Sequence, residues 1–173
     1  MVKIVTVSDS VSKGQAEDRS GAALADLLAV SGFVISERRC VSDGVDEVAQ
    51  VLRELAVDFN GLIITTGGTG FGPRDLTPEG TRLVLDREAP GIAEAMRLCN
   101  PLGRLSRGVA GTMARALVVN TPGSPGGAVE CLEAVLDVIP HALQLLGGEQ
   151  PHPHHEHAHA PKGATTIASD HDG

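Results

Sequence analysis

Aromatic side chains are almost absent from this chain of 173 residues, which contains no Trp, no Tyr and only three Phe. Its hydrophobic core must therefore be built from Val, Leu, Ile and Ala. Cysteine is also scarce, and the three present (Cys40, Cys99 and Cys131) form no C-x-x-C pair. Their odd number and wide spacing fit a reducing cytosol, in which we expect each to be a small buried hydrophobe.

Basic residues are outnumbered by acidic ones, 14 against 22, which gives a formal net charge of −8. No basic stripe is available to neutralise the phosphates of a nucleic acid, so nucleic-acid binding is not expected. A phosphorylated ligand would need locally placed N–H groups, arginines or Mg²⁺. No apolar run approaches the length of a membrane span, and the N-terminus is typical of a strand rather than a signal peptide. We therefore expect a cytoplasmic protein that makes no membrane contact.

The chain is long enough for one domain with a proper core. Strands are predicted at 2–7, 33–40, 61–66, 106–113 and 116–120. Helices are predicted at 18–31, 45–55, 78–86, 90–98 and from Pro125 onward, with Pro140 kinking or breaking the last one. This alternation predicts an α/β fold, a single-domain three-layer α/β/α sandwich around a mostly parallel sheet. The strands at 106–113 and 116–120 are expected to form a short antiparallel hairpin.

The character of the sequence changes at about Gly147. Residues 148–173 are low in complexity, rich in histidine and without an apolar period, so we predict a disordered tail after a domain of residues 1–147. The five histidines within residues 151–159 could chelate Ni²⁺, Zn²⁺ or Cu²⁺ loosely. A solvated extension that holds no specific metal is the interpretation we favour.

One stretch, residues 63–79, combines the features of a phosphate site. A buried strand is followed by four glycines within six residues, so the backbone can turn sharply and point bare N–H groups at an anion. Asp75 comes next, and a helix is predicted to start with Thr77 as N-cap and Pro78 at its first position. The P-loop is excluded because no Lys-Ser/Thr pair follows the last glycine, and the glycine spacing excludes the dinucleotide fingerprint. A plain turn between strand and helix, which would use only one or two glycines, is the alternative.

Polar or glycine-rich loops follow four of the predicted strands, at residues 8–9, Asp43, 67–75 and 122–124. In a mostly parallel α/β sheet, ligands bind beyond the carboxyl ends of the strands. We therefore expect these loops to converge on one edge and to form a single site for phosphate and a divalent cation.

Taken together, these motifs resemble the molybdenum cofactor biosynthesis family of MogA and MoaB type. The resemblance runs in uninterrupted order over about residues 1–147, and its most specific part is T-T-G-G-T-G followed by R-D-L-T-P-E. Further matching segments are residues 8–9, 18–21, 90–91, 94–97, 105–107 and 120–125. Members of this family are usually homotrimers of a compact α/β fold, which is what the resemblance implies here.

The function implied by the resemblance is that of a molybdopterin adenylyltransferase, a Mg²⁺-dependent nucleotidyltransferase. Such an enzyme transfers AMP from ATP to the terminal phosphate of molybdopterin, releases pyrophosphate, and supplies its product to a molybdenum-insertion protein. The resemblance implies Asp43 and Asp75 as the catalytic residues and the Mg²⁺ ligands. It implies nucleotide or phosphate contacts at Thr66, Gly67, Gly68, Thr69, Gly70, Pro122, Gly123 and Ser124. It implies substrate contacts at Ser8, Asp9, Arg74, Glu94, Arg97, Ser106 and Arg107.

Structural alternatives exist for the carboxylates and the serine. Asp43 could merely cap the helix that begins at Gly44, and Asp75 could be only a turn residue. Ser124 suits an N-cap, although the same exposed N–H groups would bind phosphate.

Similar alternatives exist for the long charged side chains. Arg74 and Arg107 could be surface charges, and Glu94 with Arg97 could form a solvated ion pair at i and i+3 on a helix.

Three departures from the family pattern bear on the function. Ser10 stands where the family often has arginine, and Asn100 stands where serine is common. Gly126 stands at the position after the Pro-Gly-x-Pro loop, where the family frequently has lysine. The missing cations leave a second hypothesis open, a trimeric molybdopterin carrier without adenylyltransferase activity. A third hypothesis is that the chain is a metal-insertion protein or a competence-damage-type nucleotide hydrolase, both of which carry a related domain with the same glycine loop. Such proteins normally carry this domain beside others, and we expect the chain to have no room for those other domains.

Overall fold

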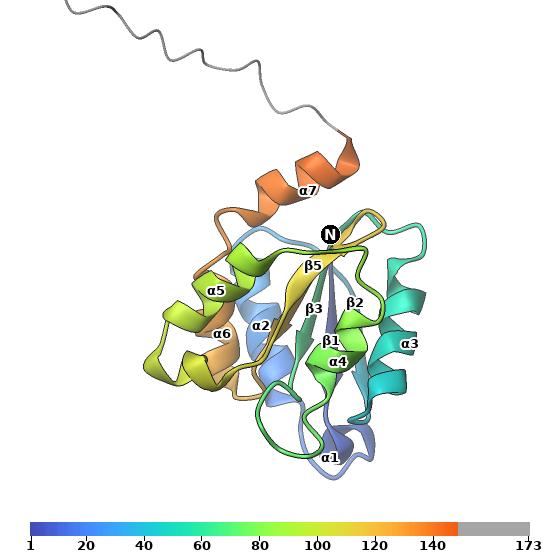
Figure 1. Ribbon diagram of the computed structural model, residues 1–173, viewed down its shortest axis with the longest axis vertical. Coiled ribbons are helices and arrows are strands. Elements are labelled where there is room, and N and C mark those ends of the chain that lie inside the picture. The colour runs from blue at the N-terminus through green and yellow to red at the C-terminus, as the bar shows by residue number, and fades with distance from the viewer. Residues whose placement is uncertain (149–173) are drawn as a thin grey trace, which may run out of the picture.

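The computed structural model describes residues 1–148, which form a six-stranded sheet with helices on both faces (Figure 1). Residues 149–173 of the predicted tail lie outside the described residues. The strands are β1 (Val2–Val7), β2 (Ile35–Val41), β3 (Gly61–Thr66), β4 (Arg87–Glu88), β5 (Ala110–Met113) and β6 (Ala116–Thr121). The helices are α1 (Asp9–Ser12), α2 (Arg19–Val30), α3 (Val45–Ala56), α4 (Thr77–Arg82), α5 (Pro90–Leu98), the 3₁₀ helix η1 (Pro101–Leu105), α6 (Pro125–Glu133) and α7 (Ile139–Gly147).

The sheet has the strand order β2-β1-β3-β6-β5-β4. Parallel pairing joins β2 to β1, β1 to β3 and β3 to β6, whereas β5 runs antiparallel to both β6 and β4. The predicted α/β fold with a mostly parallel sheet and an antiparallel hairpin is therefore confirmed.

Two hydrophobic clusters pack against opposite faces of this sheet. On β3, Leu62 and Ile64 belong to the cluster beneath α2, α5 and α6, whereas Ile63 between them belongs to the cluster beneath α3 and α4. All six residues of β3 are buried, as expected for a central parallel strand covered on both sides. The parallel direction of β1, β2, β3 and β6 places their ends, and the loops that follow them, along one edge between the two helical layers (Figure 1).

Helix α7 lies near the beginnings of β3 and β6, beyond the opposite edge of the sheet (Figure 1). The break between α6 and α7 confirms the effect expected of Pro140, which sits in the first turn of α7. Over residues 1–148, no helix combines the length and apolarity needed to cross a bilayer.

Several predicted boundaries were wrong for identifiable reasons. Strand β2 begins at Ile35 rather than Phe33, because the Phe33 N–H donates to the Leu28 carbonyl and closes the C-terminus of α2 around Gly32. Helix α4 ends at Arg82 rather than at Asp86, since the Asp86 N–H joins the sheet edge by donating to the Thr112 carbonyl at 2.8 Å.

The hairpin is also shorter than predicted, since β5 begins at Ala110 instead of residue 106. The N–H of Arg107 donates to the Thr69 carbonyl at 2.8 Å, which ties this segment to the glycine loop instead of to the sheet.

The prediction that every cysteine is buried is correct only for Cys131. Cys40, on the edge strand β2, is exposed, and so is Cys99, the residue that follows α5.

Candidate functional site

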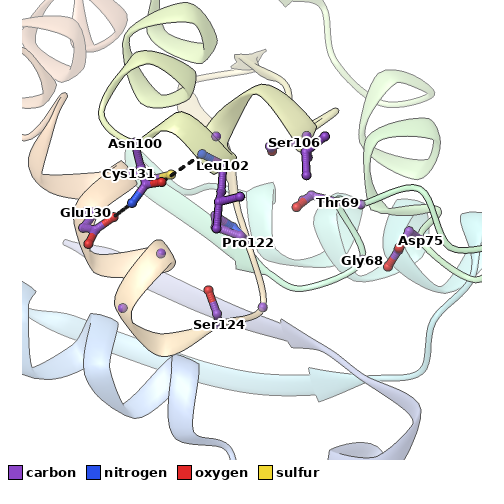
Figure 2. A pocket seen from close by; sticks show the side chains of 16 residues that line it. Gly68, Thr69, Asp75, Asn100, Leu102, Ser106, Pro122, Ser124, Glu130 and Cys131 are labelled. Carbon is purple, nitrogen blue, oxygen red and sulfur yellow. Dashed lines mark hydrogen bonds between the residues drawn. The ribbon is translucent and has the colours of Figure 1, made fainter.

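A pocket of about 500 Å³ lies at the carboxyl edge of the sheet (Figure 2). Three segments line it. The glycine loop provides Gly68, Thr69, Gly70 and Asp75. The segment that contains η1 provides Asn100, Leu102, Gly103, Leu105 and Ser106. The junction between β6 and α6 provides Pro122, Gly123, Ser124, Gly126, Gly127, Glu130 and Cys131.

Glycine is required at the start of the loop. Gly67 and Gly68 have φ angles of +104° and +62°, a region that residues with a side chain rarely adopt. A Cβ atom on Gly67 would also lie 2.2 Å from the Val7 carbonyl oxygen, and one on Gly68 would lie 2.3 Å from Thr77 Oγ1. The end of β1 and the start of α4 can therefore approach the loop only because these two side chains are missing.

A buried hydrogen-bond network beneath the loop fixes its course. Asn120 Nδ2 donates to Thr65 Oγ1 at 2.9 Å and to Thr81 Oγ1 at 3.0 Å, which joins β6 to β3 and α4. Thr77 Oγ1 donates to the Gly67 carbonyl at 2.8 Å, so the prediction that Thr77 caps α4 was wrong. Thr77 is instead the first residue of the helix, and its side chain holds the loop. Thr66, expected to contact phosphate, is buried, and its hydroxyl donates to the Pro122 carbonyl at 2.8 Å.

Arg107 supports the same loop from outside the pocket. Its Nε donates to the Gly70 carbonyl at 2.7 Å, and its two terminal nitrogens bind the Asp75 carbonyl and the Glu79 carboxylate. Burial alone would raise the pKa of the Glu79 carboxyl, but the hydrogen bond from Arg107, a backbone hydrogen bond and the charges of Arg107 and Arg82 together hold that pKa below its ordinary value. All three nitrogens of the guanidinium thus donate to protein groups, which suits positioning of the loop better than contact with substrate.

The two predicted metal ligands pack against glycines of one loop. A Cβ atom on Gly68 would lie 3.3 Å from Asp43 Oδ1, and Cβ atoms on Gly70 and Gly72 would lie 2.9 Å and 2.8 Å from Asp75 Oδ2. Asp75 Oδ2 also accepts a hydrogen bond from the Gly72 N–H at 2.7 Å, so Asp75 does shape a turn as well. Asp75 lines the pocket, whereas Asp43 lies beside it at the end of β2.

Arg74 joins the loops that surround Asp43. One of its terminal nitrogens donates to Asp9 Oδ2 at 2.6 Å and to the Asp43 carbonyl at 2.9 Å. The N–H of Asp9 in turn donates to Asp43 Oδ2 at 2.8 Å, which orients that carboxylate. Ser8 is the N-cap of α1, and Gly44 rather than Asp43 is the N-cap of α3. Ser8, Asp9 and Arg74 therefore surround Asp43 but do not line the pocket.

Unpaired N–H groups are the main polar feature of the pocket wall. Ser124 is the N-cap of α6, as predicted, but its side chain makes no capping hydrogen bond. Among the hydrogen bonds within residues 1–148, none engages the N–H groups of Gly126 and Gly127 in the first turn of α6, or those of residues 68–70. Together with the dipole of a nine-residue helix, these donors favour an anion in the pocket.

The charged side chains on the pocket wall are acidic. Asp75 and Glu130 line it, and no lysine or arginine does within the described part of the chain. Asn100 Nδ2 donates to Glu130 Oε2 at 2.8 Å and so engages one of these carboxylates (Figure 2). A polyanionic ligand would therefore depend on backbone donors and a bound cation for charge neutralisation.

Glu94 and Arg97 lie away from this pocket, beside a second hollow of about 360 Å³ that Leu98 and Arg104 also line. Arg97 Nη1 donates to the Gly108 carbonyl at 3.0 Å, which ties α5 to the segment before β5. Of the seven predicted substrate contacts, Ser106 is the one that lines the large pocket.

Sequence reasoning missed most of the η1 wall and the side of α6. The pair Asn100-Pro101 was a usable signal, because Asn100 caps η1 by accepting a hydrogen bond from the Leu102 N–H at 2.9 Å. No sequence signal marked Glu130 or Cys131, whose role depends on which face of α6 meets α5.

The fold and the pocket define an α/β ligand-binding domain with its site at the carboxyl edge of the sheet. Residues 3–157 match the family model described as a probable molybdopterin binding domain, and the chain belongs to that family. It is 36% identical over 156 residues to the molybdopterin adenylyltransferase of Helicobacter pylori J99, with 85% of this chain and 88% of that one covered. The corresponding protein of Escherichia coli K12 is 36% identical over 166 residues, with 85% of each chain covered.

A solved structure gives the same result. The molybdopterin biosynthesis enzyme MoaB of Thermus thermophilus superposes with a TM-score of 0.80 at 48% identity, covering 85% of this chain and 96% of that chain.

Proposed function

We propose that this protein is a molybdopterin adenylyltransferase of molybdenum cofactor biosynthesis. It transfers AMP from ATP to the terminal phosphate of molybdopterin and releases pyrophosphate. Two relatives that match over most of their length carry this name. The observation that carries the proposal is that Asp43 and Asp75 pack against glycines of one loop, residues 68–70 of which line a pocket of about 500 Å³.

The chain contributes mainly by holding phosphates in place. Attack of one phosphate on another brings polyanions together, so the catalyst must cancel charge and align the reacting groups. The N–H groups of residues 68–70 are suited to one phosphate group, and those of Gly126 and Gly127 at the start of α6 to another. An oxygen of the pterin phosphate forms the new bond to the α-phosphorus, and the bond from that phosphorus to the pyrophosphate oxygen breaks. The nucleophile belongs to the substrate, so no nucleophilic side chain is required.

The carboxylates Asp43 and Asp75 fit Mg²⁺. This cation typically binds through one or two carboxylates and completes its shell with phosphate oxygens and water. Within residues 1–148 no cluster of three or more His, Cys, Asp or Glu side chains could hold a metal by itself, which agrees with a cation shared with a substrate. When bound, Mg²⁺ would supply neutralisation of phosphate charge. The chain contributes the orientation of Asp43 by the Asp9 N–H and of Asp75 by the Gly72 N–H.

The proposal includes a homotrimeric, cytoplasmic protein whose product passes to a molybdenum-insertion protein. The support for these points is the resemblance to the family of MogA and MoaB type. Light scattering coupled to size exclusion would measure the subunit number directly.

The test is to mix the protein with ATP, Mg²⁺ and molybdopterin and to measure pyrophosphate and the AMP adduct. The wild type should form both, and Asp75→Asn should reduce the rate by about 100-fold or more, because the variant loses a carboxylate that would hold the Mg²⁺ that neutralises the phosphates. Asp137→Asn, a matched change at an exposed aspartate between α6 and α7, should leave the rate unchanged. Binding of molybdopterin without any product would establish the carrier function instead.

A further inference from the structure

Cys99, the residue that follows α5, meets Cys131 of α6 beside the pocket. Cys99 Sγ lies 3.9 Å from Cys131 Sγ, although the residues are 32 positions apart in the sequence. Both thiols also donate to the Met96 carbonyl, at 2.9 Å and 3.6 Å. The two sulfur atoms are thus held near each other by a shared acceptor, and the adenylyl transfer uses neither of them.

The two thiols differ in their access to solvent. Cys99 is exposed at the end of α5, whereas Cys131 is buried and its residue lines the pocket beside Glu130 (Figure 2). Burial, reinforced by the neighbouring Cys99 thiol, raises the pKa of Cys131 to about 12. An oxidant in solvent therefore reaches Cys99 first. Cys131 remains a protonated thiol next to it.

We propose that Cys99 and Cys131 form an oxidisable pair, a covalent modification site at which a hydroperoxide converts the two thiols into a disulfide. In the first step the Cys99 sulfur attacks the peroxide, its O–O bond breaks, and a sulfenic acid forms while water or an alcohol leaves. In the second step the Cys131 sulfur attacks the Cys99 sulfur and displaces hydroxide, which leaves as water with the Cys131 proton. The peroxide is the oxidant and is itself reduced, and the two steps need no other reactant.

The geometry allows this bond and gives it a structural effect. A disulfide holds its sulfurs at about 2.05 Å, so the pair must close by nearly 2 Å. Rotation of the Cys99 side chain, with loss of its hydrogen bond to the Met96 carbonyl, would supply most of that movement. Cys99 is followed directly by Asn100 and η1, which form one wall of the pocket, while Cys131 belongs to α6, which forms another. Oxidation would therefore lock together two walls that are otherwise joined by the hydrogen bond from Asn100 to Glu130.

The experiment is to expose the full-length, reduced protein to hydrogen peroxide, to count its thiols and to map disulfides by peptide mass. The wild type should fall from three free thiols to one, with a monomer mass lower by two hydrogen atoms and a Cys99–Cys131 peptide. Cys40→Ser, a matched loss of an exposed thiol outside the pocket, should fall from two thiols to none through the same bond. Cys99→Ser should show no internal disulfide.

The inference would be overturned by oxidised wild-type protein in which Cys131 remains a free thiol while Cys99 becomes a sulfinic acid or joins a second molecule. It would equally be overturned if the internal bond joined Cys40. These covalent readouts do not depend on the proposed function, which is tested separately by adenylyl transfer in the reduced protein.

Discussion

Asn120 and Thr81 are joined by a hydrogen bond of 3.0 Å that connects the last parallel strand to the helix behind the glycine loop. Both residues are buried, and the same Asn120 amide also donates to Thr65, while its carbonyl oxygen accepts the Val109 N–H at 3.1 Å. One side chain therefore links four segments beneath the pocket floor. The position of the loop depends on this interior network as much as on its own glycines.

Replacing Asn120 with the similarly sized leucine should destabilise the protein by about 3 kcal/mol, because several buried polar groups lose their partners at once. Thr81→Val removes one of these bonds and also the bond from Thr81 Oγ1 to the Thr77 carbonyl at 2.8 Å, so it should cost about 2 kcal/mol. Urea denaturation of the two variants and the wild type measures both values. Equal stability of Asn120→Leu and the wild type would contradict the role given to this network.

Substitutions at two glycines should distinguish a position where the backbone conformation requires glycine from one where glycine only lines the pocket. Gly67→Ala should lose about 2 kcal/mol or more, because the residue has a φ of +104° and its new Cβ would collide with the Val7 carbonyl. Gly126→Ala meets no atom within 4 Å and lies in α6, so it should gain a few tenths to about 1 kcal/mol. Thermal and urea unfolding check both changes. Similar effects of the two substitutions would show that the loop conformation imposes no such constraint.

The ion pair between Arg107 and Glu79 should appear as a pH dependence of stability. Arg107 holds the pKa of Glu79 below its ordinary value of 4.5 in the folded protein. The ionised carboxylate therefore stabilises the fold above that value, and this contribution is lost as the pH falls through the lower folded-state pKa. Melting temperatures of wild type and Glu79→Gln should differ most near neutral pH and converge in acid. Glu88→Gln, at an exposed carboxylate 3.2 Å from Arg82, gives the baseline for losing a surface ion pair.

Arg74 is expected to orient the Asp43 carboxylate while contributing little to the stability of the fold. It is 63% exposed, so its ion pair with Asp9 should contribute less than about 1 kcal/mol. Because it also binds the Asp43 carbonyl, Arg74→Gln should nevertheless lower kcat/KM by about tenfold through a misplaced carboxylate. Steady-state kinetics beside a melting curve separate these effects. A large drop in melting temperature with unchanged kinetics would contradict this assignment.

The sequence predicted the elements that local pattern determines. The buried run that became β3, the helix 90–98 and the glycine loop each have a period or composition that needs no knowledge of distant residues. The sequence could not show that the Thr77 hydroxyl turns back to the Gly67 carbonyl, or that the Arg107 guanidinium is occupied by the loop. Those contacts depend on long-range packing, which also brings Cys99 to Cys131.

The cation-sharing role of Asp43 and Asp75 is tested most directly by a double-mutant cycle on nucleotide binding. Calorimetry would measure ATP affinity of the wild type, Asp43→Asn, Asp75→Asn and the double variant, with Mg²⁺ and with EDTA. If both carboxylates hold one ion, each single change should remove most of the Mg²⁺-dependent affinity, and the double variant should bind no worse than the weaker single one. Additive losses, or losses that persist in EDTA, would show that the two aspartates act independently and would contradict a shared metal site.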